Sequence, residues 1–176
     1  PPEVISQELP PIEVFTPQDY AAEDQNWAIS QGLNDELYFA NNKGLLQYNG
    51  ARWQLYATPN GSILRTVEVI GEKIYTGCYM DFGYWVKDRF GLLNYSSLVS
   101  ENSIDVLEDE QFWNIIALED WVLFQSLNRI YIYNWDGKPY RAINLDRYIY
   151  TFCVDKHDKL IYSYDLSSGN LIKANI

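Results

Sequence analysis

His157 is the only histidine of the chain, and histidine is the side chain best suited to acid–base or metal chemistry near neutral pH. It lies in the polar stretch 155–159, a pattern typical of a solvated turn between strands. The two cysteines, Cys78 and Cys153, fall at strand positions that predict burial, and we expect both to be unpaired thiols. One histidine and no Cys-x-x-Cys pair exclude an ordinary zinc site, and no glycine-rich nucleotide loop is present. The sequence therefore predicts no catalytic residue, no metal site and no cofactor.

Acidic side chains are abundant, and they cluster in the stretch 105–110. The cluster consists of Asp105, Glu108, Asp109 and Glu110. We interpret it as a solvated loop between repeats; a calcium site is the alternative, although the spacing is not that of a calcium loop. Composition alone also leaves open a pair of carboxylates that hydrolyse a glycan.

A second group of polar and aromatic residues falls at turns that we expect to share one face of the fold. Amides, a guanidinium, a carboxylate and phenols are all represented, and this mixture suits a polar ligand such as an oligosaccharide. The candidate ligand-binding residues are Asn26, Asn41, Arg65, Tyr79, Asp81, Asn114, Asn128 and Tyr150. We expect four tryptophans in strands to pack between structural repeats instead of stacking on a ligand: Trp27, Trp53, Trp85 and Trp113.

The elements that hold these residues are short strands joined by tight turns. The clearest example is the stretch 44–53, in which an apolar strand precedes Asn49 and Gly50 and a second strand begins at Trp53. Both turn residues tolerate a positive φ, so we predict a two-residue type I′ turn. Weaker copies of this stretch recur three times downstream.

The repeat length distinguishes between all-β architectures. Equivalent positions of the second strand recur about every 40 residues, the period of a four-stranded propeller blade; they are Leu37, Ile74, Val122 and Leu160. We therefore predict an all-β chain, a β-propeller with about four four-stranded antiparallel blades. A β-solenoid is the competing fold, but its turns do not group strands in fours.

The predicted organisation is an extended lead-in over residues 1–11 and a partial propeller over residues 12–176. The blades are expected at residues 26–57, 63–98, 111–145 and 149–176, with a short helical turn within residues 99–110. The last blade lacks a fourth strand, which a strand at residues 12–16 could supply by closing the ring. The alternative, which we favour, is a larger ring cut short, whose open apolar faces would drive self-association.

Charge limits the partners of the chain. The formal net charge is −11 and no run of basic residues occurs, so we expect no direct contact with nucleic acid. No apolar stretch approaches the roughly 20 residues that a membrane-spanning helix needs. We therefore expect no membrane-spanning segment in this chain.

Several stretches of the first two repeats resemble a known family. They are residues 17–20, 25–29, 38–42, 44–50 with Trp53, and 81–84. These residues resemble the N-terminal sensor propeller, built of two-component-regulator propeller repeats, of Bacteroidetes membrane regulators with a triple-tyrosine motif. The resemblance implies a ring of about seven blades in the periplasm, followed by a sandwich domain, a membrane helix and either a LuxR-type or a histidine-kinase output domain.

The resemblance also implies a function: a non-enzymatic domain that senses an extracytoplasmic signal. The signal would be a polar ligand, a glycan among the candidates, or a partner protomer, and the regulator would control transcription. A rigid platform for another protein is one alternative. A carboxylate-dependent glycan hydrolase or lyase is a further and less favoured one.

Overall fold

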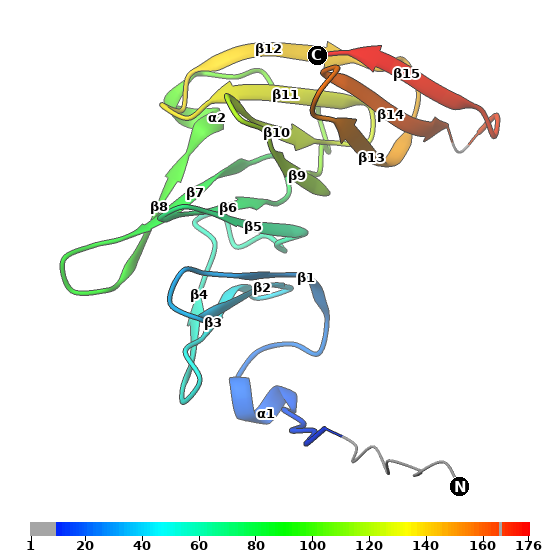
Figure 1. The fold of residues 1–176 in the computed structure, drawn as a ribbon. Helices are drawn as coiled ribbons and strands as arrows, with labels where there is room; N and C mark the ends of the chain where they lie inside the picture. Colours follow the sequence, from blue (N-terminus) through cyan, green and yellow to red (C-terminus); the bar gives the residue numbers. More distant parts are fainter. Residues whose placement is uncertain (1–9, 166) are drawn as a thin grey trace, which may run out of the picture.

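The computed structural model describes residues 10–165 and 167–176, and these residues form fifteen strands and two four-residue helices. Most of the predicted lead-in therefore lies outside the described residues. The strands form three four-stranded sheets and one three-stranded sheet, each an antiparallel meander. Figure 1 shows these sheets as successive blades of a β-propeller. The predicted fold class is confirmed.

Each blade follows the chain from its inner to its outer strand. Blade 1 contains β1 (Asn26–Gln31), β2 (Leu37–Asn41), β3 (Gly44–Tyr48) and β4 (Trp53–Tyr56). Blade 2 contains β5 (Thr66–Ile70), β6 (Lys73–Gly77), β7 (Phe82–Lys87) and β8 (Leu93–Ser97). Blade 3 contains β9 (Asn114–Ala117), β10 (Trp121–Gln125), β11 (Arg129–Asn134) and β12 (Pro139–Asn144). Blade 4 has only β13 (Ile149–Asp155), β14 (Leu160–Asp165) and β15 (Leu171–Asn175).

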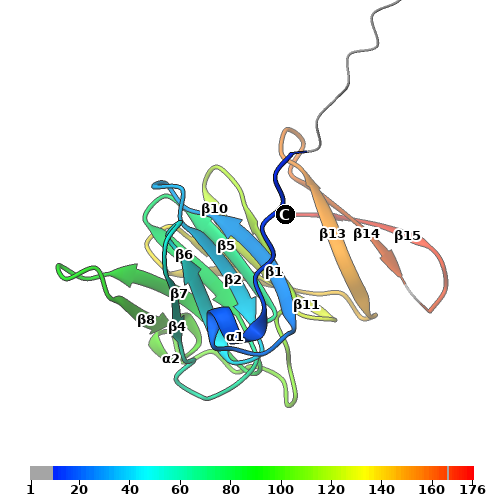
Figure 2. The ribbon, with the colours of Figure 1, turned by 90° about the horizontal axis from the view of Figure 1, so that it is seen from below.

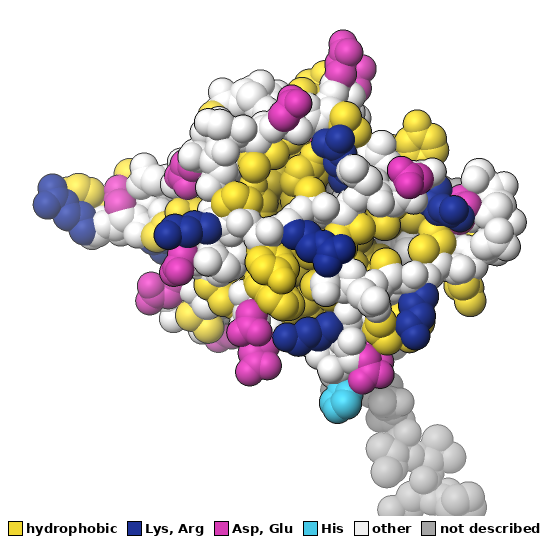
Figure 3. All heavy atoms as spheres, turned by 90° about the horizontal axis from the view of Figure 1, so that it is seen from above, with side chains coloured by type: hydrophobic (Ala, Val, Ile, Leu, Met, Phe, Trp, Pro, Cys, Tyr) yellow, Lys and Arg dark blue, Asp and Glu magenta, His cyan; other side chains and the backbone are white. Residues whose placement is uncertain are grey.

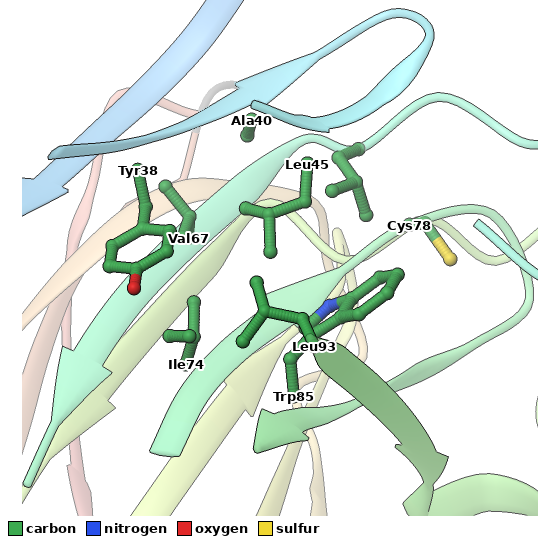
Figure 4. Packing of buried hydrophobic residues seen from close by; sticks show 9 residues of the cluster. Tyr38, Ala40, Leu45, Val67, Ile74, Cys78, Trp85 and Leu93 are labelled. Carbon is green, nitrogen blue, oxygen red and sulfur yellow. The ribbon is translucent and has the colours of Figure 1, made fainter. Parts of the chain in front are cut away.

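Apolar side chains between consecutive blades form the core. Between blades 1 and 2, Tyr38 and Leu45 pack against Val67, Ile74 and Trp85, as Figure 4 shows. A second cluster, rich in aromatic rings, joins blades 2 and 3, and a third joins blades 3 and 4. Successive side chains of a strand point to opposite faces of the sheet, so in β10 Val122 and Phe124 pack toward blade 2 and Leu123 packs toward blade 4.

The hairpin between β3 and β4 differs from the predicted type I′ turn. Tyr48 pairs with Trp53, so the loop has four residues, and only Gly50 takes a positive φ, of 87°. The Asn49 side chain accounts for the difference, because its Oδ1 accepts hydrogen bonds from the backbone N–H groups of Ala51 (3.1 Å) and Arg52 (2.8 Å). The asparagine acts through its side chain, as in an Asx turn, and not through its own backbone angle.

The predicted strand at residues 12–16 is wrong. This stretch has no regular structure and leads into α1 (Pro17–Tyr20). The ring of Phe15 lies 5.2 Å from that of Tyr48 and 5.3 Å from that of Trp53, and Tyr20 packs on Trp53 at 5.4 Å. The segment therefore covers the outward face of blade 1, because an aromatic cluster is available there, and it does not complete blade 4.

The helical turn expected within residues 99–110 is present only at its start, as α2 (Leu98–Glu101), where Ser97 Oγ accepts a hydrogen bond from the Ser100 N–H at 3.0 Å. Among the described residues, neither helix has the length and hydrophobicity needed to cross a membrane.

Blade 4 leaves one face uncovered. Tyr150, Tyr164 and Leu171 are 66%, 46% and 86% exposed, and Cys153, which we predicted to be buried, is exposed beside Tyr162. Within the described residues, no apolar cluster joins blade 4 to blade 1, and Figures 1 and 2 show the two blades apart. Figure 3, which looks onto blades 3 and 4, shows hydrophobic side chains gathered between Lys and Arg.

Candidate ligand site at the inner strands

Three residues meet where the inner strands begin. Trp27 lies at the start of β1, Arg65 immediately precedes β5, and Trp113 immediately precedes β9. The Arg65 guanidinium carbon lies 4.2 Å from the ring centroid of Trp27 and 4.8 Å from that of Trp113. The two indoles are 6.0 Å apart and inclined at 79°, so they form a corner that holds the guanidinium. We call these three residues the axial cluster.

Hydrogen bonds fix the axial cluster from both sides. Arg65 donates through Nε to Gln111 Oε1 at 3.1 Å. Trp27 donates through Nε1 to Asn42 Oδ1 at 2.8 Å. The Nε1 atom of Trp113, in contrast, is buried and has no hydrogen-bond partner among the described residues. Hydrogen bonds thus hold Trp27 and Arg65 in place, whereas the indole N–H of Trp113 donates to no described residue.

A pocket of about 260 Å³ adjoins the axial cluster. Asp109, Gln111, Trp113, Asn128 and Tyr148 are among the residues that line it. A second hollow of about 410 Å³ shares Asn128 and Tyr148 with the first. Aromatic surface beside amide, carboxylate and phenol groups can hold a polar ligand by stacking and by hydrogen bonds.

Two ionisable side chains at this site, Arg65 and Tyr79, have shifted pKa values. Partial burial lowers the pKa of Arg65, because the surrounding indoles remove water from the guanidinium. Tyr79 donates to Asp109 Oδ1 at 2.6 Å, and this hydrogen bond raises the pKa of the Tyr79 phenol. Tyr79 and Asp109 are thereby held together at the rim of the pocket.

Of the eight residues predicted from the sequence, Arg65, Tyr79 and Asn128 lie at this site. Asn26 and Asn41 bond to each other at 2.9 Å, and Asn41 is fully buried. Its side chain also donates to the backbone carbonyls of Glu23 and Gln25, so its polar atoms stabilise the start of blade 1. Asn41 is therefore committed to this structural role, whereas Asn26 is exposed beside it.

The remaining three predicted residues are placed separately. Asp81 lies inside blade 2 and accepts hydrogen bonds from Tyr95 (3.0 Å) and Ser97 (2.6 Å), and burial raises its pKa. Asn114 is half-buried at the start of β9, and Tyr150 is exposed on β13. No described side-chain hydrogen bond or aromatic contact joins either residue to the axial cluster.

Sequence reasoning missed four contributors to the site. Trp27 and Trp113 were assigned to packing, because their strand positions resemble those of Trp53 and Trp85, which do pack in apolar clusters. Gln111 and Tyr148 precede inner strands, as Arg65 does. The rule that turns before inner strands share one face would have found both.

The acidic cluster is only partly a solvated loop. Asp105, Glu108 and Asp109 are exposed, whereas Glu110 is 5% exposed, which corrects the sequence interpretation. Glu110 accepts hydrogen bonds from the hydroxyls of Ser126 (2.5 Å) and Tyr131 (2.8 Å), and these stabilise its burial. In the part of the chain that the structure describes, no three acidic, histidine or cysteine side chains gather as a metal site would require. His157 lies in an exposed turn, as predicted.

Another hollow, of about 400 Å³, lies between blades 1 and 2 at the opposite end of the strands. Glu36 and Lys87 in its lining form an ion pair. Glu36 also accepts hydrogen bonds from Tyr38 and Gln47. Burial raises the pKa of Glu36, but Lys87 first, and then these hydrogen bonds, outweigh burial and hold the pKa below its usual range. The ion pair of Glu36 and Lys87 thus occupies two of the charged side chains in the lining of this hollow.

No protein-family model and no curated protein matches the chain, but solved structures do. The β-propeller domain of Cps50 (Swd1) from Myceliophteria thermophila has a TM-score of 0.64 and 14% identity over 86% of this chain and 54% of that one. The extracellular domain of a putative one-component system from Bacteroides thetaiotaomicron has a TM-score of 0.58 and 19% identity, over 84% and 21%. Virginiamycin B lyase from Staphylococcus aureus has a TM-score of 0.59 and 13% identity, over 86% and 55%.

At these identities the likeness establishes the propeller fold and nothing finer. The chain spans about half the length of the lyase and of the Swd1 domain, and about a fifth of the Bacteroides domain.

Proposed function

We propose that the chain is part of a non-enzymatic propeller that binds a polar ligand, with oligosaccharides the leading class, at the axial cluster. The observation that carries this proposal is the corner of Trp27, Arg65 and Trp113 beside a pocket lined by amide, carboxylate and phenol groups. Aromatic faces stack on the apolar faces of sugar rings, and the polar groups bind hydroxyls. The cluster takes residues from three blades, so a bound ligand would bridge them.

We further propose that the propeller is the extracytoplasmic, periplasmic sensor of a bacterial membrane regulator. The extracellular domain of a putative one-component system is among the similar structures, and the sequence resemblance points to the same class. A ligand would act by binding one arrangement of the regulator more tightly than another, since differential affinity is all that a signal requires. The output domain belongs to regions outside this chain.

The uncovered face of blade 4 supports a larger ring. Tyr162, Tyr164 and Leu171 occupy one face of the sheet, as apolar residues do in the interfaces between blades 1 to 4. Further blades of the same polypeptide would cover this face and would supply the outer strand that pairs with β15.

A carboxylate-dependent hydrolase or lyase is less well supported. One similar structure is a lyase. However, Asp81 and Glu110 are each engaged by two hydroxyl groups within their own blades. If the chain were such an enzyme, wild-type protein would release reducing sugar from a glycan and Asp81→Asn would not.

Thermal shift against a panel of soluble oligosaccharides tests the proposal. We expect at least one member to raise the midpoint of unfolding of the wild type, because the exposed indole of Trp27 would stack on the sugar. The same member should not change the midpoint of Trp27→Ala. Tyr140→Ala is the matched control, because Tyr140 is also exposed but stacks on Trp121 elsewhere in blade 3. Stabilisation by no member would instead favour a platform for another protein.

A further inference from the structure

Among the residues that the structure describes, the Arg65 guanidinium has no acidic partner. Its only polar contact is the hydrogen bond from Nε to Gln111, and its terminal nitrogens donate to no residue that the structure describes. Burial lowers its pKa, and no neighbouring carboxylate opposes this effect. The two indole faces hold the guanidinium in place, and its terminal N–H groups can take a counter-charge from a ligand.

The missing partner does not reflect a shortage of acids. The chain has 24 acidic and 13 basic side chains. The acids around the cluster are bound elsewhere: Glu23 accepts from Asn42, Asp109 from Tyr79, and Glu110 from Ser126 and Tyr131. These carboxylates therefore accept hydrogen bonds from other residues, and none of them pairs with Arg65.

We propose that the terminal nitrogens of Arg65 bind an oxyanion group of the ligand, so that the ligand is an acidic saccharide. This inference rests on the proposed function. A planar guanidinium with free terminal N–H groups binds a carboxylate or sulfate through two parallel hydrogen bonds. The rest of the saccharide would extend along the adjoining pocket, where Asp109 accepts from hydroxyls and Asn128 both donates and accepts.

A matched pair of ligands isolates the oxyanion. Isothermal titration calorimetry is performed with trigalacturonate, with its methyl ester, and with inorganic sulfate. The ester keeps the rings and linkages and removes only the charges. We expect trigalacturonate to bind at least about tenfold more tightly than the ester, because hydrogen bonds to charged groups contribute more than neutral ones. Its affinity should fall as salt is added, because salt screens the attraction between the charges.

The variants assign this preference to one residue. Arg65→Gln should abolish the difference between acid and ester, and Arg65→Lys should retain part of it. Arg141→Gln, an exposed arginine on β12, should leave the difference unchanged. The wild-type ratio and its salt dependence do not depend on whether a variant folds.

Each other result has a defined meaning. If acid and ester bind equally, the oxyanion assignment is overturned while the proposed sugar site stands. If sulfate alone binds as tightly as trigalacturonate, the site is one for a free anion and the saccharide assignment is overturned. If neither these probes nor any member of the oligosaccharide panel binds, the proposed function and the inference both fail.

Discussion

At the scale of single residues, Asp81 shows how a polar turn residue can serve its own blade. The sequence places it in a turn that suits a ligand, but the turn folds back so that Tyr95 and Ser97 reach its carboxylate. Gly83 permits this arrangement, because a Cβ there would lie 2.1 Å from the Ser96 carbonyl oxygen and 2.9 Å from the Tyr95 hydroxyl. The hydrogen bond between Asp81 and Tyr95 therefore depends on the absence of a side chain at residue 83.

Burial raises the pKa of Asp81 above 3.8, which predicts a pH dependence of stability. A group whose pKa is higher in the folded state contributes stability below its unfolded pKa, and that contribution is lost as the pH rises through the folded value. Urea unfolding between about pH 4 and about pH 7 should therefore show wild type losing stability relative to Asp81→Asn. A difference that stays constant, or that grows with pH in favour of the wild type, would contradict this account.

Gly83→Ala should destabilise the chain by about 3 kcal/mol, because the new methyl group meets backbone and cannot be accommodated by a rotamer change. Gly71→Ala is the control: nothing lies within 4 Å of its Cβ, and only its φ of 60° is unfavourable, at about 1 kcal/mol. Denaturant unfolding measures both. Equal losses in the two variants would mean that the close approach of β7 and β8 is relieved more easily than we argue.

At the scale of elements, the segment before β1 behaves as a cover for a sheet face. Phe15 and Tyr20 lie on the aromatic surface of Trp53, and Tyr20 is buried with Ala22 and Leu46. Asp19 accepts hydrogen bonds from the N–H and the hydroxyl of Thr16, which lower the pKa of Asp19 and close the short helix α1. A segment that looks like a strand in sequence is thus held by ring contacts.

Tyr20→Ala should lower the free energy of unfolding by about 3 kcal/mol, as for other buried aromatic rings. Val14→Ala, at a residue that is 77% exposed in the same segment, should change it by less than about 0.5 kcal/mol. Chemical denaturation followed by tryptophan fluorescence measures both. A negligible loss for Tyr20→Ala would show that the segment is not docked on blade 1.

Strands that repeat along the chain could be predicted from the sequence more reliably than single turns or segments. The recurrence of Leu37, Ile74, Val122 and Leu160 predicted the second strand of every blade, because a repeated pattern lets each copy support the others. The turn at Asn49 was predicted wrongly because its conformation depends on the Asn49 side chain as a hydrogen-bond acceptor. The segment 12–16 was predicted wrongly because its position depends on aromatic rings far away in the sequence. Topology placed Arg65 on the predicted ligand face. Its contacts with Trp27 and Trp113 could not be predicted from local patterns, because the three residues come from three different blades.

At the scale of the whole molecule, the four blades stack through three apolar interfaces, and no described residue covers the outer face of the last blade. Leu171 is 86% exposed on that face, and no described strand pairs with the outer edge of β15. Uncovered apolar faces and open strand edges promote association.

We therefore expect the chain to self-associate as its concentration rises, and Leu171→Lys to weaken the association. Leu33→Lys is the matched control, because Leu33 is 75% exposed on the loop between β1 and β2, away from blade 4. Size-exclusion chromatography with light scattering measures both. A monomer at every concentration, or an equal effect of the two substitutions, would contradict an open face on blade 4.

The central claim, that a ligand binds at the axial cluster, is tested most directly by the indole N–H resonances of the six tryptophans in a ¹⁵N–¹H NMR titration with trigalacturonate. We predict that the resonances of Trp27 and Trp113 shift together and saturably. Those of Trp85, which donates to Thr76 inside blade 2, and of Trp135, which donates to the Glu119 carbonyl, should not move. Saturable shifts confined to other tryptophans, with Trp27 and Trp113 unchanged, would contradict the account.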